Sequence, residues 1–99
     1  MTATDLARSA AIDTQPSADL SDTARCLWLA KAGKWHEAHD LCQELPDTRA
    51  GAWIHAWLHR EEGDFGNAGY WYARAGKPAP ANKADLAAEW EQIATALLA

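Results

Sequence analysis

The residues of this 99-residue chain that are best suited to chemistry are its four histidines, His36, His39, His55 and His59. The first two are three positions apart and the last two are four apart, so each pair shares one face if its segment is helical. Pro46 lies between the pairs and would end the first helix. At a rise of about 1.5 Å per residue, the two pairs reach matching heights on neighbouring antiparallel helices.

A cluster of imidazoles on two facing helices has two interpretations. The leading one is a structural rim, in which the histidines hydrogen-bond across the helices and can also respond to pH. The alternative is a metal site, because imidazole is a common ligand of Zn²⁺, Ni²⁺ and Cu²⁺, and Glu37, Asp40 or Glu62 would complete the ligand set. The spacing of the first pair is one residue short of the zinc-protease motif, so no hydrolytic activity follows from it.

Other catalytic groups are scarce in the sequence. The segments expected to be helical after residue 33 contain no serine, and the chain has no glycine-rich phosphate loop. Cys26 and Cys42 fall on apolar faces of the expected helices, whereas a reactive thiolate needs a partly exposed, electropositive environment. We therefore expect both cysteines to be buried hydrophobic residues and the protein to be non-catalytic.

The composition indicates that the elements carrying these residues are helices. The chain is 48% hydrophobic but has no valine, and its β-branched apolar residues are three isoleucines, which disfavours strands. Alanine and leucine, which favour helices, make up most of the hydrophobic residues. We predict an all-α fold with one helical domain over residues 17–99, preceded by a flexible lead-in over residues 1–16 that has room for a short helix. Apolar spacing and turn residues predict helices over about 17–32, 34–45, 48–62, 65–75 and 82–97.

The two central hairpins of this prediction form an internal repeat. Gly33 and Ala38 of the first unit align with Gly63 and Ala68 of the second, at an offset of 30 residues. Since a single helix hairpin cannot bury its apolar face alone, the two units are expected to stack.

The second unit resembles the tetratricopeptide repeat family. Its turn glycine, small residues, aromatic residue and proline follow the spacings of that family, at Gly63, Ala68, Tyr72, Ala75 and Pro80. The resemblance covers about residues 19–80, although the family's repeat is longer, at about 34 residues, and its first-helix Trp-Leu-Gly-Tyr pattern is absent here. It implies two stacked hairpins in a right-handed α-α superhelix, closed by a C-terminal capping helix, and a docking surface for a protein or peptide. Residues 55–71 are also faintly similar to uncharacterised bacterial and fungal proteins, which implies no activity.

The docking surface implied by this resemblance is a groove lined by large side chains, in a chain with six tryptophans. Tryptophan, tyrosine and arginine often contribute most of the binding energy at an interface. The candidate groove residues are Leu27, Trp53, Trp57, Arg60 and, on the next helix, Tyr70. The alternative is that the C-terminal helix buries its apolar stripe there through Trp90 and fills the groove. The leading functional prediction is a small non-catalytic interaction module for a protein or peptide, including a second copy of the chain as a homodimer. The second prediction is a metal-binding protein that uses the four histidines to hold Zn²⁺ or another divalent transition metal.

The charge balance argues against two classes of partner. The formal net charge is −5, and the nine lysine and arginine residues are scattered, whereas nucleic acids and anionic membranes bind basic surfaces. No apolar run is long enough to span a bilayer, and the N-terminal residues lack the apolar core of a secretory signal. We therefore expect a cytoplasmic protein that binds neither nucleic acids nor membranes.

Overall fold

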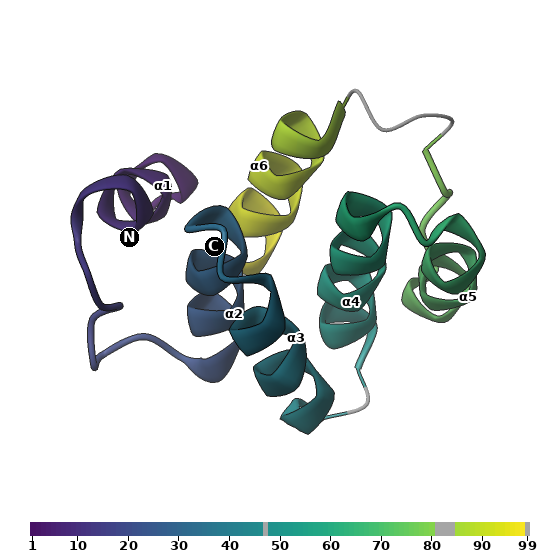
Figure 1. Cartoon of the computed structure of the whole chain (residues 1–99), viewed down its shortest axis with the longest axis horizontal. Helices are drawn as coiled ribbons and strands as arrows, with labels where there is room; N and C mark the ends of the chain where they lie inside the picture. The colour runs from purple at the N-terminus through teal and green to yellow at the C-terminus, as the bar shows by residue number, and fades with distance from the viewer. Residues whose placement is uncertain (47, 81–84, 99) are drawn as a thin grey trace.

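In the computed structural model, which describes residues 1–46, 48–80 and 85–98, the chain folds into α-helices joined by turns (Figure 1). These residues form no strand, which confirms the all-α prediction. The helices are α1 (Ala3–Ile12), α2 (Asp22–Lys31), α3 (Trp35–Glu44), α4 (Arg49–Glu62), α5 (Phe65–Ala75) and α6 (Leu86–Leu97).

Side-chain caps and a glycine set the ends of the helices that carry the candidate residues. The Thr48 side chain accepts a hydrogen bond from the Gly51 N–H at the start of α4, over 3.1 Å, and Ser21 caps α2 in the same way. Gly63 ends α4 with a φ of +89°, a left-handed conformation that glycine adopts without steric strain. The boundaries follow the predicted ranges except at two starts. α2 begins at Asp22 instead of about residue 17, and α6 begins at Leu86, while residues 82–84 of its predicted range lie outside the described residues.

The helices pair in sequence and the last one returns across them. α2 packs against α3 and α4 packs against α5, so the two predicted hairpins are present (Figure 1). α6 packs against both α2 and α4, and α1 packs against α2 and α6. The right-handed superhelical winding implied by the tetratricopeptide resemblance stays a prediction.

The N-terminal residues differ from the flexible lead-in that the sequence suggested. Thr2 and Asp5 form a reciprocal capping box at the start of α1, and Leu6 is fully buried in the core. The Trp28 indole N–H of α2 donates a hydrogen bond to the Ser9 hydroxyl over 3.0 Å. α1 packs on the core because Ala3, Leu6 and Ala10 follow helical spacing and form an apolar stripe on one face. The stripe is inconspicuous in the sequence because two of its three residues are alanine.

The core lies between α2, α4 and α6. Trp28, Leu58, Trp90 and Ile93 are almost completely buried there and belong to one continuous cluster. Cys26 also belongs to it, and both cysteines are free and buried, as predicted. Within the described part of the chain, no helix combines the length and the apolar character that crossing a membrane requires.

Candidate metal centre

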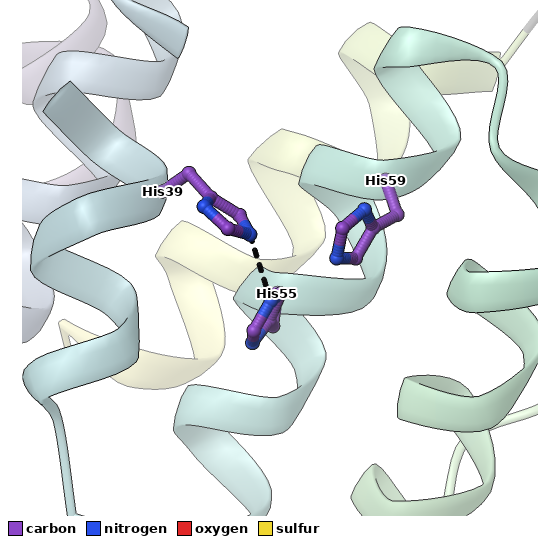
Figure 2. Close-up of side chains that lie close together, drawn as sticks. All are labelled: His39, His55 and His59. Atoms are coloured by element: carbon purple, nitrogen blue, oxygen red, sulfur yellow. Dashed lines mark hydrogen bonds between the residues drawn. The ribbon is translucent and has the colours of Figure 1, made fainter. Parts of the chain in front are cut away.

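Three of the four histidines converge between α3 and α4. His39 projects from α3 toward His55 and His59 of α4, and one ligand nitrogen from each ring lies within 4.8 Å of the other two (Figure 2). The closest pair is His39 Nε2 and His55 Nε2, which are 3.1 Å apart. His36 is exposed and belongs to no such group among the described residues. The convergence expected from the sequence therefore holds for three histidines, which we call the histidine trio (His39, His55 and His59), and not for the fourth.

The α4 helix positions two members of the trio by its own geometry. His55 and His59 are one turn apart, and their rings stack with centroids 4.8 Å apart and an interplanar angle of 20°. Both residues are 6% exposed, whereas His39 is half-buried at the edge of α3. The trio is therefore held in the packed interface between the hairpins, with His39 on its more open side.

Two tryptophans orient the rings of the trio. Trp35 stacks on His39 with centroids 4.8 Å apart and an interplanar angle of 10°, and its indole N–H donates to the Leu58 carbonyl over 2.8 Å. Trp71 of α5 stacks on His55 at 4.0 Å and 16°. Sequence reasoning placed both tryptophans on apolar faces and did not connect them with the histidines. The four-residue spacing of Trp35 and His39 was an available signal, whereas the contact of Trp71 depends on the packing of α5 on α4.

The protonation states of His39 and His55 suit metal binding. Burial, followed by the proximity of His59, lowers the pKa of His39 below its usual 6.5, and the same causes together with His39 lower the pKa of His55 to about 4. Both rings are therefore neutral at pH 7, the form in which imidazole binds a metal. In the metal-free protein the 3.1 Å contact requires one Nε2 to donate and the other to accept.

The third histidine carries an unsatisfied nitrogen. His59 Nδ1 is buried and has no hydrogen-bond partner among the described residues, and the Glu62 carboxylate is 3.7 Å away. A buried nitrogen without a partner costs about 1–3 kcal/mol, so a ligand that used it would gain stability. Of the three carboxylates considered from sequence, only Glu62 lies in a possible metal-binding group with a histidine, while Glu37 and Asp40 lie in none that the described residues form.

The spacing of the trio is close to what a tetrahedral ion needs. With metal–nitrogen bonds of about 2.0–2.1 Å, the ligand atoms of a tetrahedral Zn²⁺ site are about 3.3 Å apart. The 3.1 Å between the Nε2 atoms of His39 and His55 already matches this spacing, and the third ring nitrogen lies within 4.8 Å of both. The distances between the ligand nitrogens are therefore compatible with one shared ion.

The cysteines do not contribute to the centre. The Cys42 thiol donates a weak hydrogen bond to the Gly51 carbonyl over 3.5 Å, in the first turn of α4. The neighbouring Cys26 thiol and burial raise the pKa of the Cys42 thiol well above its usual value. A thiol that stays protonated is neither a good ligand nor a good nucleophile.

The candidate groove is covered rather than open. Leu27, Trp57 and Arg60 are each at most 4% exposed. The Trp57 indole N–H donates to the Leu86 carbonyl of α6 over 2.8 Å. The Trp90 indole N–H of α6 donates in turn to the Leu27 carbonyl over 3.0 Å. The sequence left open whether the C-terminal helix fills the groove, and at these three residues α6 does so, because it buries its apolar stripe against them.

The two remaining groove residues have different surroundings. Trp53 is half-buried and donates its indole N–H to the Glu89 carboxylate of α6 over 3.2 Å. Tyr70 is 56% exposed on α5, where its hydroxyl accepts a hydrogen bond from Arg74 over 3.2 Å. The five candidate groove residues therefore do not share one surface.

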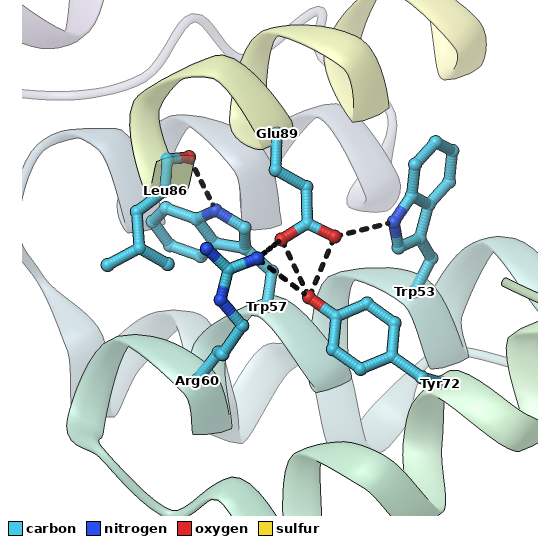
Figure 3. A network of polar contacts seen from close by, with 6 residues as sticks. All are labelled: Trp53, Trp57, Arg60, Tyr72, Leu86 and Glu89. Carbon is cyan, nitrogen blue, oxygen red and sulfur yellow. Dashed lines mark hydrogen bonds and ion pairs between the residues drawn. The ribbon is translucent and has the colours of Figure 1, made fainter. Parts of the chain in front are cut away.

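A buried polar network replaces the groove and fixes α6 (Figure 3). The Glu89 carboxylate pairs with the Arg60 guanidinium and accepts from the Tyr72 hydroxyl, whose oxygen lies 2.6 and 2.7 Å from its two oxygens. Burial and the hydrogen bond to Glu89 raise the pKa of the Tyr72 hydroxyl, so it stays a donor. The network uses Arg60 as a structural residue, because the guanidinium is 1% exposed and neutralised within the fold.

Comparison of the chain with protein-family models, with curated proteins and with solved structures gives no match. A functional proposal for this chain therefore rests on its own residues and their geometry.

Proposed function

We propose that the protein binds a divalent transition-metal ion through the histidine trio. The observation that carries the proposal is the convergence of three imidazoles from two helices, with ligand nitrogens within 4.8 Å of one another. Burial keeps two of these rings neutral at pH 7, so they bind an ion without first releasing a proton. The stacked tryptophans hold the rings in place, which lowers the entropy lost on binding.

The donor set favours one class of metal. Three imidazole nitrogens suit Zn²⁺, Cu²⁺ or Ni²⁺, whereas Mg²⁺ and Ca²⁺ prefer oxygen ligands. Three protein ligands leave one position of a tetrahedral ion for water or for an exogenous ligand. The half-buried His39 marks the side from which an ion reaches the trio.

The test is calorimetric titration of the untagged, chelator-treated protein with Zn²⁺ at pH 7. We expect the wild type to bind Zn²⁺ tightly. The affinity of this site should be at least about 10-fold lower in His39→Ala, because one of three ligands is lost. His36→Ala is the matched control, since it removes an exposed histidine three residues away on the same helix, and its affinity should equal that of the wild type. Absence of tight binding by the wild type, or equal losses in the two variants, would overturn the proposal.

The function as an interaction module stays a prediction, and the groove suggested for it is occupied by α6 at Leu27, Trp57 and Arg60. Its partner, a protein, a peptide or a second copy of the chain, would need another surface. On α5, Phe65 and Tyr70 are the large hydrophobic residues that are more than half exposed. No observation on the described residues identifies an occupant for them, so metal binding is the function that the geometry supports best.

A further inference from the structure

We propose that a second divalent cation binds next to the first, held by His59 Nδ1, Glu62 and Asp64, so that His59 bridges two ions. This inference rests on the proposed function, because His59 is also a member of the histidine trio. The two sites would share one imidazole ring, with Nε2 facing the trio and Nδ1 facing the carboxylates.

The first observation is the set of atoms around His59 Nδ1. One ligand atom from each of His59, Glu62 and Asp64 lies within 4.8 Å of the other two. The Nδ1 atom is 3.7 Å from Glu62 Oε2, which is slightly more than the ~3.3 Å between two ligands of one tetrahedral ion. A small approach of the flexible Glu62 side chain would place both atoms on the same ion.

The second observation is the unsatisfied state of that nitrogen. His59 is 6% exposed, and Nδ1 is a buried polar atom with no hydrogen-bond partner among the residues described. Exposed carboxylates often cluster without binding anything, but a buried imidazole nitrogen directed at them supplies the fixed ligand that such clusters lack. The nitrogen therefore distinguishes this group from an ordinary acidic surface.

The second site also lies at the C-terminal end of α4, where the helix dipole favours a cation. His59 and Glu62 lie in the last turn of α4, which Gly63 ends, and cations are stabilised near a helix C-terminus by the helix dipole. Asp64 caps α5 through hydrogen bonds from Asn67, at 3.2 Å to Oδ1 and 3.3 Å to Oδ2. Each of its oxygens keeps a second lone pair for a cation.

Binding of two ions to one imidazole ring requires the loss of the proton on its second nitrogen. A neutral imidazole has one nitrogen with a free lone pair and one N–H, so it binds one ion. When a second ion binds Nδ1, the ring must release that proton to solvent and becomes an imidazolate, with one metal–nitrogen bond on each side. The imidazolate and the two carboxylates supply three negative charges against the four positive charges of the two ions.

A competing role for Glu62 makes a different prediction. In many metal sites, a carboxylate accepts the N–H of a ligating histidine and raises its affinity for a single ion by about 10–100-fold. That role needs one ion, no imidazolate and no contribution from Asp64. The number of bound ions therefore separates the two arrangements.

The experiment is titration of the chelator-treated chain with Zn²⁺, with the bound metal counted by elemental analysis after removal of excess ion. We expect two ions per wild-type chain and one ion in Glu62→Gln/Asp64→Asn, whose trio keeps its affinity within about 10-fold. Both substitutions preserve shape, and asparagine still caps α5. The matched control is Glu37→Gln/Asp40→Asn, which removes the same charge from exposed positions of α3 and should still bind two ions.

Loading with Cu²⁺ tests the bridge itself. Two Cu²⁺ ions joined by an imidazolate couple their spins, so the resonance signal of the doubly loaded wild type should account for far less copper than elemental analysis finds. The Glu62→Gln/Asp64→Asn chain, with one ion, should give the full signal. One ion per wild-type chain, two ions in the double variant, or an uncoupled signal from two bound Cu²⁺ ions would overturn this inference while the proposed function stands. A wild type that binds no ion would overturn both.

Discussion

At the scale of single residues, burial decides what the histidines can do. His36 and His39 differ by one turn of α3, yet one faces solvent and the other lies 3.1 Å from His55. Burying the side chains of His55 and His59 costs stability, because a charged imidazole at His55 is poorly solvated and the buried His59 Nδ1 has no hydrogen-bond partner among the described residues. Buried histidines with perturbed pKa values are typical of functional sites, and this favours the proposed metal site over a structural rim.

The lowered pKa of His55 makes stability depend on pH. Its pKa is about 4 in the folded protein and 6.5 in an unfolded chain, so the unfolded state binds more protons between these values. We expect the contribution of His55 to the free energy of unfolding of the metal-free protein to be constant near pH 7 and above. It should fall as the pH drops from about 6.5 to 4, by up to about 3 kcal/mol.

Urea denaturation at several pH values, with chelator present, measures this dependence. The control is His55→Gln, which is polar but does not titrate, because comparing it with the wild type removes the contribution of the carboxylates. The variant should lose part of the stability at pH 7 and show a shallower decline toward pH 4. Parallel stability curves for the two proteins would show that His55 is not the titrating group.

At the scale of elements, α6 is the helix that sets the shape of the molecule. It lies over the face that a tetratricopeptide-like array would leave open, and it brings Glu89 to Arg60, Tyr72 and Trp53 (Figure 3). These partners lie on α4 and α5, so a single carboxylate joins the last helix to the second hairpin. The helix that carries two members of the trio, α4, is therefore also the one on which α6 packs.

Replacing Glu89 should therefore be strongly destabilising. Glu89→Ala leaves the Arg60 guanidinium, which is 1% exposed, without its counter-charge, and breaking a buried ion pair in this way costs about 3–5 kcal/mol. Glu91→Ala, two positions along α6 at an exposed site, should change stability by less than about 0.5 kcal/mol. Chemical denaturation followed by circular dichroism compares the two variants. A loss below about 1 kcal/mol in Glu89→Ala would mean that the network contributes little.

At the scale of the whole molecule, the histidine trio lies where the two hairpins meet. His39 belongs to the first hairpin, while His55, His59 and the stacking Trp71 belong to the second. An ion bound to the trio would therefore cross-link the hairpins, and binding to the folded state alone adds stability by mass action.

Zinc should accordingly raise the melting temperature of the protein. At a free concentration about 100 times the dissociation constant, binding adds about 2.7 kcal/mol, which corresponds to roughly 10–20 °C for a domain of this size. Thermal scans by circular dichroism should show the increase in the wild type and in His36→Ala, and little of it in His39→Ala. Excess chelator should reverse it. An equal increase in all three proteins would place the stabilising ion outside the trio.

Local chemistry in the sequence determined the helices and their pairing. Alanine and leucine without valine exclude strands, glycines at positions 33 and 63 mark two of the turns, and the period of His55 and His59 puts them on one face whatever surrounds them. The sequence left room for a short helix before residue 16 but did not indicate that it packs on the core, because the buried stripe of α1 is mostly alanine, whose apolar signal is weak.

The tertiary structure alone decided which side chains meet. The rotation of α3 about its own axis brings His39 into the trio and leaves His36 in solvent, and spacing along the chain does not specify that angle. The return of α6 across the hairpins turns a predicted groove of Trp57 and Arg60 into core, because an amphipathic helix packs on whichever apolar surface the fold leaves within its reach. Periodicity is a property of each segment, whereas contact between segments depends on how the whole chain packs.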